Sequence, residues 1–468
     1  MLLRRWAPGL GEYSPNEFLI RVSPDHPFYD RAIDDWATPT GPRVAVLFHE
    51  YLHYLHNVST YAGFKNFLIF QSLLGLFSEA VIGRTLETDS TTRNHHYEQL
   101  LELLDRLQGV PTAEDDADDL LVVAVKYESW AVNLPGKDPI GGESAMVCVQ
   151  PSILGSAGDE FICEFGQYAI EEGIAYELEQ LVDEAGGGGP LPFPGALPYF
   201  LLRRVAEDVV GARLARPDLV RCAILSLELP SPGPFLLRLF ERCRDVENPA
   251  NCIDEAARDL ARSRPKRMAL VLSEVDDLVR NYSGRGLAAA GMQELAALMR
   301  EFAEKRTSDP TFELAPFSSG KADLEAVVQL LHAVTPCNAV QEFEGSPEAV
   351  ARDVLLAFGP DRTTGGFSRT DGLAALQCIV HYLSCHLGEL NFLPPPSDDP
   401  KVTRCPYYTS CTLEFRVQDA AICRNAPWKR MENDPTCWYG SGAAAVHGLV
   451  NIRVLSVRDD ASSPKAVG

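Results

Sequence analysis

Between Val46 and Val58 the sequence carries two histidines four residues apart within an apolar helical pattern. The centre of this segment is the pentapeptide His49-Glu50-Tyr51-Leu52-His53. Residues four apart lie on one face of an α-helix, so both imidazoles can face a single metal ion, with the Glu50 carboxylate beside it. Two imidazoles and a carboxylate base next to an open coordination position are typical of a zinc ion that activates water.

The residues around the pentapeptide favour a helix with one apolar and one polar face. Pro42 suits a first helical turn, and Thr40 and Gly41 before it are cap candidates. The apolar arc of a 3.6-residue wheel contains Leu47, Phe48, Tyr51, Leu52, Leu55 and Val58, and the opposite arc contains His49, Glu50, His53 and His56. We expect the polar face to line a cleft. The alternative interpretation is an ordinary amphipathic helix with a solvated polar face.

A catalytic zinc ion usually has three protein ligands and a water, so a third ligand is needed. His56 follows His53 by one turn, but three ligands in a row on a straight helix would not surround an ion. We therefore expect His56 beside the site rather than on the metal. A second helical pattern at 167–179 offers Glu172 opposite its apolar arc, and Glu171 as an alternative nearer that arc.

The second helix reads Glu-Gly-x-Ala-x-x-x-Glu from Glu172 onward. Together with the first motif it resembles the gluzincin metallopeptidases, especially their aminopeptidase-like branch. The resemblance implies Zn²⁺ as the cofactor, with the ligands His49, His53 and Glu172 and the general base Glu50. It covers two helices, and more than a hundred residues separate them, which implies a long inserted segment. Tyr176 stands where thermolysin-like enzymes have an aspartate, so the partner of the zinc-bound histidine stays open.

The resemblance also implies a reaction, the hydrolysis of peptide bonds by metal-activated water. Glu50 would take a proton from that water and pass it to the leaving amine. The oxyanion of the transition state needs a donor besides the metal. Tyr168 and Tyr176 are the candidates on the second helix, and His381 and His386 are more distant ones. The alternative function is a catalytically silent, zincin-like interaction or regulatory protein.

Composition limits the class of protein and its partners. The chain has 468 residues, 46% hydrophobic content and a net charge of -23, as expected for an acidic globular protein of two or three domains. The charge argues against nucleic acid as a partner. A polypeptide substrate is what the resemblance to metallopeptidases implies. Residues 1–8 lack the apolar core of a signal peptide, which predicts a cytoplasmic protein. The apolar stretch 67–82 is interrupted by polar residues and predicts a buried helix rather than a membrane span.

The pattern along the chain predicts a mainly α fold with a small β-sheet, in the α+β class. We expect a zincin-like catalytic core with a long helical insertion at 1–185, a helical region at 186–345 and a mixed, cysteine-containing C-terminal region at 346–468. The Gly/Pro-rich segment from Gly186 marks the first boundary. The helical region is also a candidate surface for a regulatory protein partner. Alternation and apolar periodicity predict strands at 17–22, 121–125 and 412–417, and helices at 217–227 and 234–244.

The twelve cysteines are expected to be reduced, because no secretion signal is evident. Cys163 and Cys222 have the apolar surroundings of small core residues. The C-terminal region holds a denser group, and the spacing of its members fits no standard zinc pair: Cys405, Cys411, Cys423 and Cys437. Buried thiols are the preferred interpretation of this group, and a second metal site is the alternative.

Overall fold

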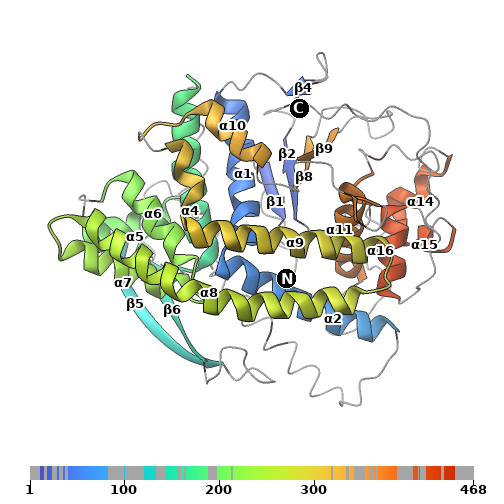
Figure 1. Ribbon diagram of the computed structural model, residues 1–468, viewed down its shortest axis with the longest axis horizontal. Helices are drawn as coiled ribbons and strands as arrows, with labels where there is room; N and C mark the ends of the chain where they lie inside the picture. The colour runs from blue at the N-terminus through green and yellow to red at the C-terminus, as the bar shows by residue number, and fades with distance from the viewer. Residues whose placement is uncertain are drawn as a thin grey trace.

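The computed structural model shows a protein built mainly of α-helices, with a small β-sheet beside the first of them (Figure 1). This confirms the predicted mainly α architecture with a small β component. The residues that the structure describes are 11–14, 18–23, 29–30, 35–36, 41–82, 98, 100, 121–132, 144–154, 160–162, 165–187, 198–211, 214–317, 320–333, 337–341, 354–358, 363–364, 367–386, 404–408, 411, 418–433 and 437–447.

The described helices of the first 333 residues include the one that carries His49 and His53 and those that pack around it or beside its neighbours. They are α1 (Gly41–Ser59), α2 (Tyr61–Ile82), α4 (Gln167–Ala185), α5 (Leu201–Val210), α6 (Arg216–Ser226), α7 (Pro232–Arg244), α8 (Pro249–Tyr282), α9 (Leu287–Ser308), the 3-10 helix η1 (Phe312–Phe317) and α10 (Leu324–Ala333). The C-terminal helices are α11 (Arg369–His386), α14 (Ala420–Asn425), the 3-10 helix η2 (Pro427–Lys429), α15 (Arg430–Asn433) and α16 (Trp438–Val446). The helices predicted at 217–227 and 234–244 are thus confirmed as α6 and α7.

The principal sheet joins strands from both ends of the chain. Its order is β1 (Gly11–Ser14), β2 (Leu19–Val22), β8 (Cys337–Gln341) and β9 (Val354–Phe358). β2 pairs in parallel with β8, while the two outer pairs are antiparallel. The strand predicted at 17–22 is confirmed as β2. Because α1 packs on β1 and β2, the sheet lies directly beside the histidine helix.

The remaining strands form smaller units. The segment predicted at 121–125 is confirmed and extends to a long hairpin of β5 (Leu121–Val132) with β6 (Ser144–Leu154), to which β7 (Glu160–Ile162) is added. Two-residue strands form the pairs β3 (Tyr29–Asp30) with β4 (Asp35–Trp36) and β10 (Thr363–Thr364) with β11 (Phe367–Ser368). The strand predicted at 412–417 lies outside the described residues.

Helix α1 is buried on its polar as well as its apolar side. It packs against α4, α2, α9 and α10. His49, Glu50 and His53 are only 6%, 8% and 7% exposed. The interpretation of this face as a solvated one is therefore wrong, because α4 covers it. A polar face this deeply buried needs partners of its own, since a buried polar group without a hydrogen bond or a counter-charge is costly.

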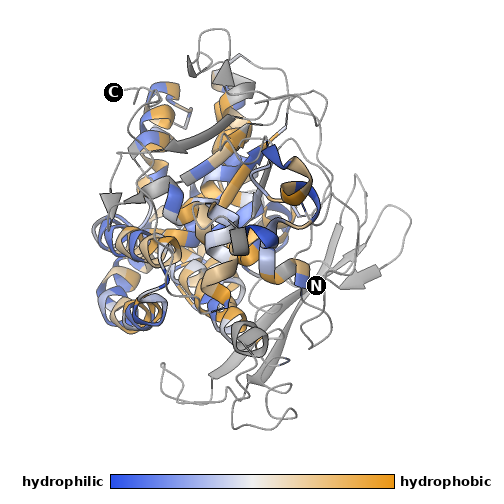
Figure 2. Ribbon diagram, turned by 90° about the vertical axis from the view of Figure 1, so that its right-hand side faces the viewer, coloured by the Kyte–Doolittle hydropathy of each residue, from blue (hydrophilic) through white to orange (hydrophobic). Residues whose placement is uncertain are grey.

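Helices from all three predicted regions contribute to a common hydrophobic core (Figure 2). Helices α8 and α9 run side by side along the length of the molecule (Figure 1). Helices α11 and α16 pack against α9 near its N-terminal end, at the right of the view. The boundaries at 185 and 345 stay predictions. None of the helices in the described part of the chain is long and apolar enough to cross a membrane. The first part of the stretch at 67–82 is buried in α2, as its sequence predicts.

Candidate metal centre

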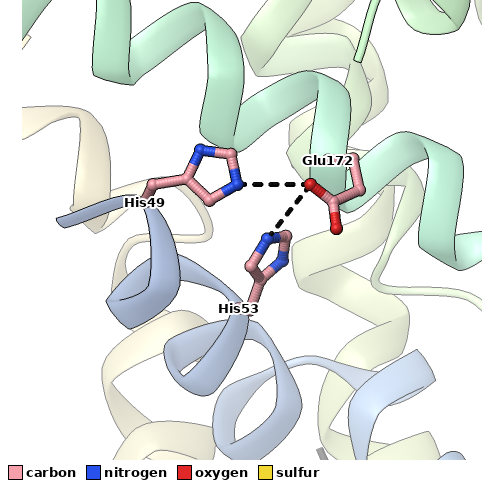
Figure 3. A group of neighbouring side chains, drawn as sticks. All are labelled: His49, His53 and Glu172. Carbon is pink, nitrogen blue, oxygen red and sulfur yellow. Dashed lines mark hydrogen bonds and ion pairs between the residues drawn. The ribbon is translucent and has the colours of Figure 1, made fainter. Parts of the chain in front are cut away.

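Three side chains predicted as metal ligands come together between α1 and α4. His49 and His53 lie one turn apart on α1, and Glu172 faces them from α4 (Figure 3). The Nε2 atoms of the two histidines are 3.2 and 3.4 Å from the same atom, Oε2 of Glu172. One ligand atom from each of the three residues lies within 4.8 Å of the other two. Among the described residues this is the sole group of three or more metal-ligating side chains at such spacing.

The donor set fits zinc. Zinc binds imidazole nitrogen and carboxylate oxygen at about 2.0–2.2 Å, and catalytic zinc sites keep three protein ligands and an open position. Two nitrogens and one oxygen converge here from two rigid helices. The cluster is also buried, so a dication would compensate charge that water does not reach. These features match the set His49, His53 and Glu172, and the identity of the metal stays a prediction.

Glu179 supplies the histidine partner that the sequence left open. Its Oε2 atom lies 2.9 Å from Nδ1 of His49. Glu179 follows Glu172 by seven residues, which places both on one face of α4. An Nδ1–H that donates to a carboxylate leaves the Nε2 lone pair free for a metal and fixes the orientation of the ring. The signal was present in the sequence, because Glu179 is the last residue of the Glu-Gly-x-Ala-x-x-x-Glu pattern.

Glu172, rather than Glu171, is the carboxylate that faces the histidines. Glu171 instead accepts a hydrogen bond from Nε2 of Gln167 at 2.8 Å. Burial raises the pKa of Glu171 to about 7, although His53 lowers it in part. The sequence-based preference for Glu172 thus agrees with the geometry.

The charges of the three side chains are strongly coupled. Burial alone would lower the pKa of His49 and His53, but the carboxylates of Glu179 and Glu172 outweigh it and hold both pKa values above the ordinary value of 6.5. Burial alone would raise the pKa of Glu172, but His53 and His49 hold it well below its usual range. In the absence of a metal, the group therefore behaves as a buried ion pair of imidazolium and carboxylate. A metal ion would replace the protons of the histidines.

Glu50 is placed beside this group and against strand β1. Burial raises its pKa to about 7, while His49 and His53 act in the opposite direction. A Cβ atom added to Gly11 would lie 2.7 Å from Cγ and 2.8 Å from Oε1 of Glu50. The first residue of β1 must therefore be small, because the Glu50 carboxylate occupies the space where a side chain would begin.

Three tyrosines lie near the centre, and they differ in what they contact. Burial and a hydrogen bond with Glu172 contribute to the raised pKa of Tyr168. The ring of Tyr176 packs against Phe200 and Tyr199, with centroid distances of 4.8 and 6.0 Å. Tyr168 is therefore in the cluster, whereas Tyr176 is one layer away from it. The catalytic roles predicted for both stay predictions.

Tyr199 was not predicted, and it lies closer to the site than Tyr176. Its ring centroid is 6.0 Å from that of His49. Its pKa is raised by burial first and then by the charges of Glu172, Glu50 and Glu179. No local pattern marks this residue, because it follows the Gly/Pro-rich segment and only the fold returns it to α4.

The other candidates of the sequence stand apart from the ligands. His56 lies behind them, with Nε2 3.4 Å from Oε1 of Glu313. His381 bonds with the hydroxyl of Tyr439 at 2.9 Å, and Nδ1 of His386 donates to the Tyr382 carbonyl at 3.0 Å. These hydrogen bonds of His381 and His386 are thus with residues of the C-terminal helices α11 and α16.

The described cysteines are free thiols, and nearly all of them are buried. Cys222 is fully buried, as predicted, and Cys163 lies outside the described residues. In the C-terminal group Cys405, Cys423 and Cys437 are buried and Cys411 is half-buried. No three described cysteines approach each other as closely as the ligands of the metal centre do. The geometry therefore favours the predicted buried thiols.

Comparison with known proteins adds no relative to this description. No protein-family model, no curated protein and no solved structure matches the chain.

Proposed function

We propose that this protein is a zinc-dependent peptidase with a zincin-like catalytic core of gluzincin type. The observation that carries the proposal is the convergence of His49, His53 and Glu172 on one point, with Glu50 buried next to them. Zinc bound there would lower the pKa of a water molecule and polarise a carbonyl group. The ligands, the base and the outer carboxylate Glu179 form a complete set for such a site.

Glu50 acts as the general base in this proposal. A base works best when its pKa is near the working pH, and in the metal-free protein burial raises the pKa of Glu50 to about 7, which offsets part of the lowering that a bound dication would cause. It takes a proton at its carboxylate and returns that proton to the leaving amine. Gly11 supports this role, because it leaves the carboxylate room against the start of β1.

Tyr199 acts as the donor to the developing oxyanion. Its ring centroid lies 6.0 Å from that of His49, and its pKa is raised by burial and by the charges of Glu172, Glu50 and Glu179, so the hydroxyl stays protonated and can donate. Tyr168 is less suited, because it interacts with the ligand Glu172 itself. Tyr168 instead orients that ligand.

Strand β1 supports a peptide as the substrate. It is at the end of the described strand order, with β2 on one side only. An extended peptide can add to such an edge through main-chain hydrogen bonds. Because Gly11 of β1 touches Glu50, a peptide on this edge would have its scissile bond close to the base. A cytoplasmic location and a restricted set of protein targets belong to the same proposal.

The test is cleavage of a mixed peptide library by the zinc-loaded protein, followed by mass spectrometry. The wild type should cleave, while a zinc-loaded Glu50→Gln variant should be slower by about 10²–10⁴-fold, the usual contribution of a general base. Glu184→Gln, at an exposed position of the same helix as Glu172, is the matched control and should cleave normally. A zinc-loaded wild type without cleavage beyond the Glu50→Gln level would contradict the proposal and favour the catalytically silent alternative.

A further inference from the structure

A second cluster of charged side chains lies behind the metal centre, at the C-terminal end of α1. We call it the ionic cluster. Every member is at most 1% exposed: His56, Ser59, Glu228, Arg264, Arg306 and Glu313. Its members come from α1, the turn after α6, α8, α9 and η1. Five parts of the chain that are far apart in sequence therefore meet at the end of the histidine helix.

Both guanidinium groups of the cluster bind the last residue of α1. Nη2 of Arg264 donates to the Ser59 carbonyl at 3.1 Å. Nε of Arg306 donates to the Ser59 hydroxyl at 2.8 Å. The C-terminus of a helix carries partial negative charge and unpaired carbonyls, so cations there are favourable. These contacts fix the end of α1 along its axis.

The carboxylates of the cluster complete its charge balance. Glu313 pairs with Arg306 at 2.7 Å, and Glu228 pairs with Arg264. Oε1 of Glu313 is also 3.4 Å from Nε2 of His56. Burial lowers the pKa of His56 to about 4, so this histidine is neutral at neutral pH. Two positive and two negative charges remain, and the contact to His56 restricts rotation of α1 one turn after the ligand His53.

Stability does not account for such a cluster. Burying four charges costs desolvation, and apolar residues of similar volume are often as stable or more stable in their place. What a charged cluster adds is directional contact. Its contacts with α1 are made at Ser59 and His56, on the turn that follows the ligands. A small rotation of α1 would move His49 and His53 together away from Glu172.

We propose that the ionic cluster is a positioning device for the metal centre, which sets the rotation and axial position of α1 so that both histidines face Glu172. The inference rests on the metal site of the proposed function. It adds that α8, α9 and η1, more than 200 residues after the ligand histidines, are needed for metal affinity. Glu313 and Arg306 are the positioning residues, and they act through His56 and Ser59.

The experiment removes one balanced pair of charges and measures zinc affinity and folding separately. In the full chain, Arg306→Met with Glu313→Gln removes one positive and one negative charge and keeps a polar group beside His56. Thermal unfolding of the metal-free protein should stay within about 3 °C of wild type, because a buried pair is replaced as a unit. Zinc affinity, from competition with a chelator, should fall about 10–100-fold, as for other residues that orient metal ligands.

The matched control is an ion pair outside the cluster, which joins α8 to α9. Arg300→Met with Asp276→Asn removes a half-exposed ion pair and should leave zinc affinity unchanged. Wild-type zinc affinity in a folded Arg306→Met/Glu313→Gln variant would overturn the inference. That result differs from failure of the proposed function, which would be absence of zinc binding in the wild type.

A smaller change keeps the inference testable if the double variant does not fold. Ser59→Ala removes only the hydroxyl that Arg306 contacts and leaves all charges in place. In the cobalt-substituted protein it should alter the visible absorption bands, which report ligand geometry, while metal-free thermal unfolding stays close to wild type. A cobalt spectrum identical to that of the wild type would overturn the inference.

Discussion

Two buried polar clusters lie on the same helix, and they differ in whether their charges balance when their histidines are neutral, as metal-binding histidines are. The ligand cluster of His49, His53, Glu50, Glu172 and Glu179 contains three carboxylates and two histidines. The ionic cluster one turn further contains two arginines and two glutamates around a neutral histidine. Carboxylates outweigh burial at His49 and His53, and the pKa values of both histidines are raised. The pKa of His56 is lowered to about 4.

This difference in charge balance distinguishes the ligand cluster, as a site for a cation, from the ionic cluster, as a structural element. The ionic cluster needs no further ion to neutralise it, so its charges serve the fold and the position of its neighbours. The ligand cluster with neutral, metal-binding histidines holds excess negative charge out of water, which is costly without a cation. Three histidines on one helix thus have two functions, and their charged neighbours distinguish them better than their spacing does.

The largest effect expected on the folded state comes from breaking the balanced cluster. Glu313→Ala leaves Arg306 buried with only the more distant Glu228, 3.7 Å away, as its counter-charge, and should lower the free energy of unfolding of the metal-free protein by about 3–5 kcal/mol. Urea unfolding at pH 7 measures it. A loss of well under 1 kcal/mol would mean that Arg306 and Glu313 do not form a buried ion pair in solution. Asp276→Asn, in a half-exposed pair, is the control and should cost little.

Tyr199 gives the next largest effect, and it concerns catalysis at the ligand cluster rather than stability of the fold. Tyr199→Phe should reduce kcat by about 10²–10³-fold, the usual effect of losing one oxyanion donor. Zinc content should be unchanged. Tyr176→Phe is the matched control, and an equal loss of kcat in both variants would remove the distinction between them.

Glu50→Gln should have the opposite sign to Glu313→Ala in the metal-free protein. The folded-state pKa of Glu50 is about 7, above the ordinary value of 4.5, so ionising it costs stability. That cost is absent below pH 4.5, grows as the pH rises to 7 and is complete above 7. The variant should therefore gain up to about 3 kcal/mol at pH 8 and nothing at pH 4. Unfolding curves across this range test it, and a pH-independent difference would contradict the assignment.

Glu179→Gln should give the smallest effect, because it weakens the ligand cluster without removing a ligand. The amide keeps an acceptor for Nδ1 of His49 but loses the charge. Zinc affinity should fall about 10–100-fold, as for other outer-shell partners of ligating histidines. Glu184→Gln, further along α4, should leave it unchanged. Equal zinc affinities in Glu179→Gln and wild type would show that His49 is oriented by other contacts.

Local periodicity predicted the parts of the site that lie on single helices. The four-residue spacing placed His49 and His53 on one face, and the apolar arc of the second helix separated Glu172 from Glu171. The structure brings these side chains together across 123 residues of sequence. Periodicity also predicted β2, α6 and α7, because each has a short pattern of its own. The sequence therefore predicts the site residues that share one face of a single helix.

Contacts between distant segments could not be predicted in this way. Tyr199, Gly11 and the ionic cluster reach α1 and α4 only through the packing of helices and strands from elsewhere in the chain. Arg306 meets Ser59 across 247 residues, and Arg264 meets it across 205. No spacing rule links such pairs. For the same reason the sequence predicted Tyr168 and Tyr176 as candidate donors and did not indicate Tyr199, because it shows which helix carries a residue but not which loop packs against that helix.

The most direct test of the account is the zinc content of the purified full-length protein, compared with that of Glu172→Ala. Elemental analysis should find about one zinc per wild-type chain, since a single such group is found in the described residues. Glu172→Ala should be folded and nearly free of zinc, because two histidines alone leave the ion without its third ligand. A folded wild type that takes up no zinc, even after reconstitution, would contradict the account. Full zinc occupancy in Glu172→Ala would contradict the assignment of its third ligand.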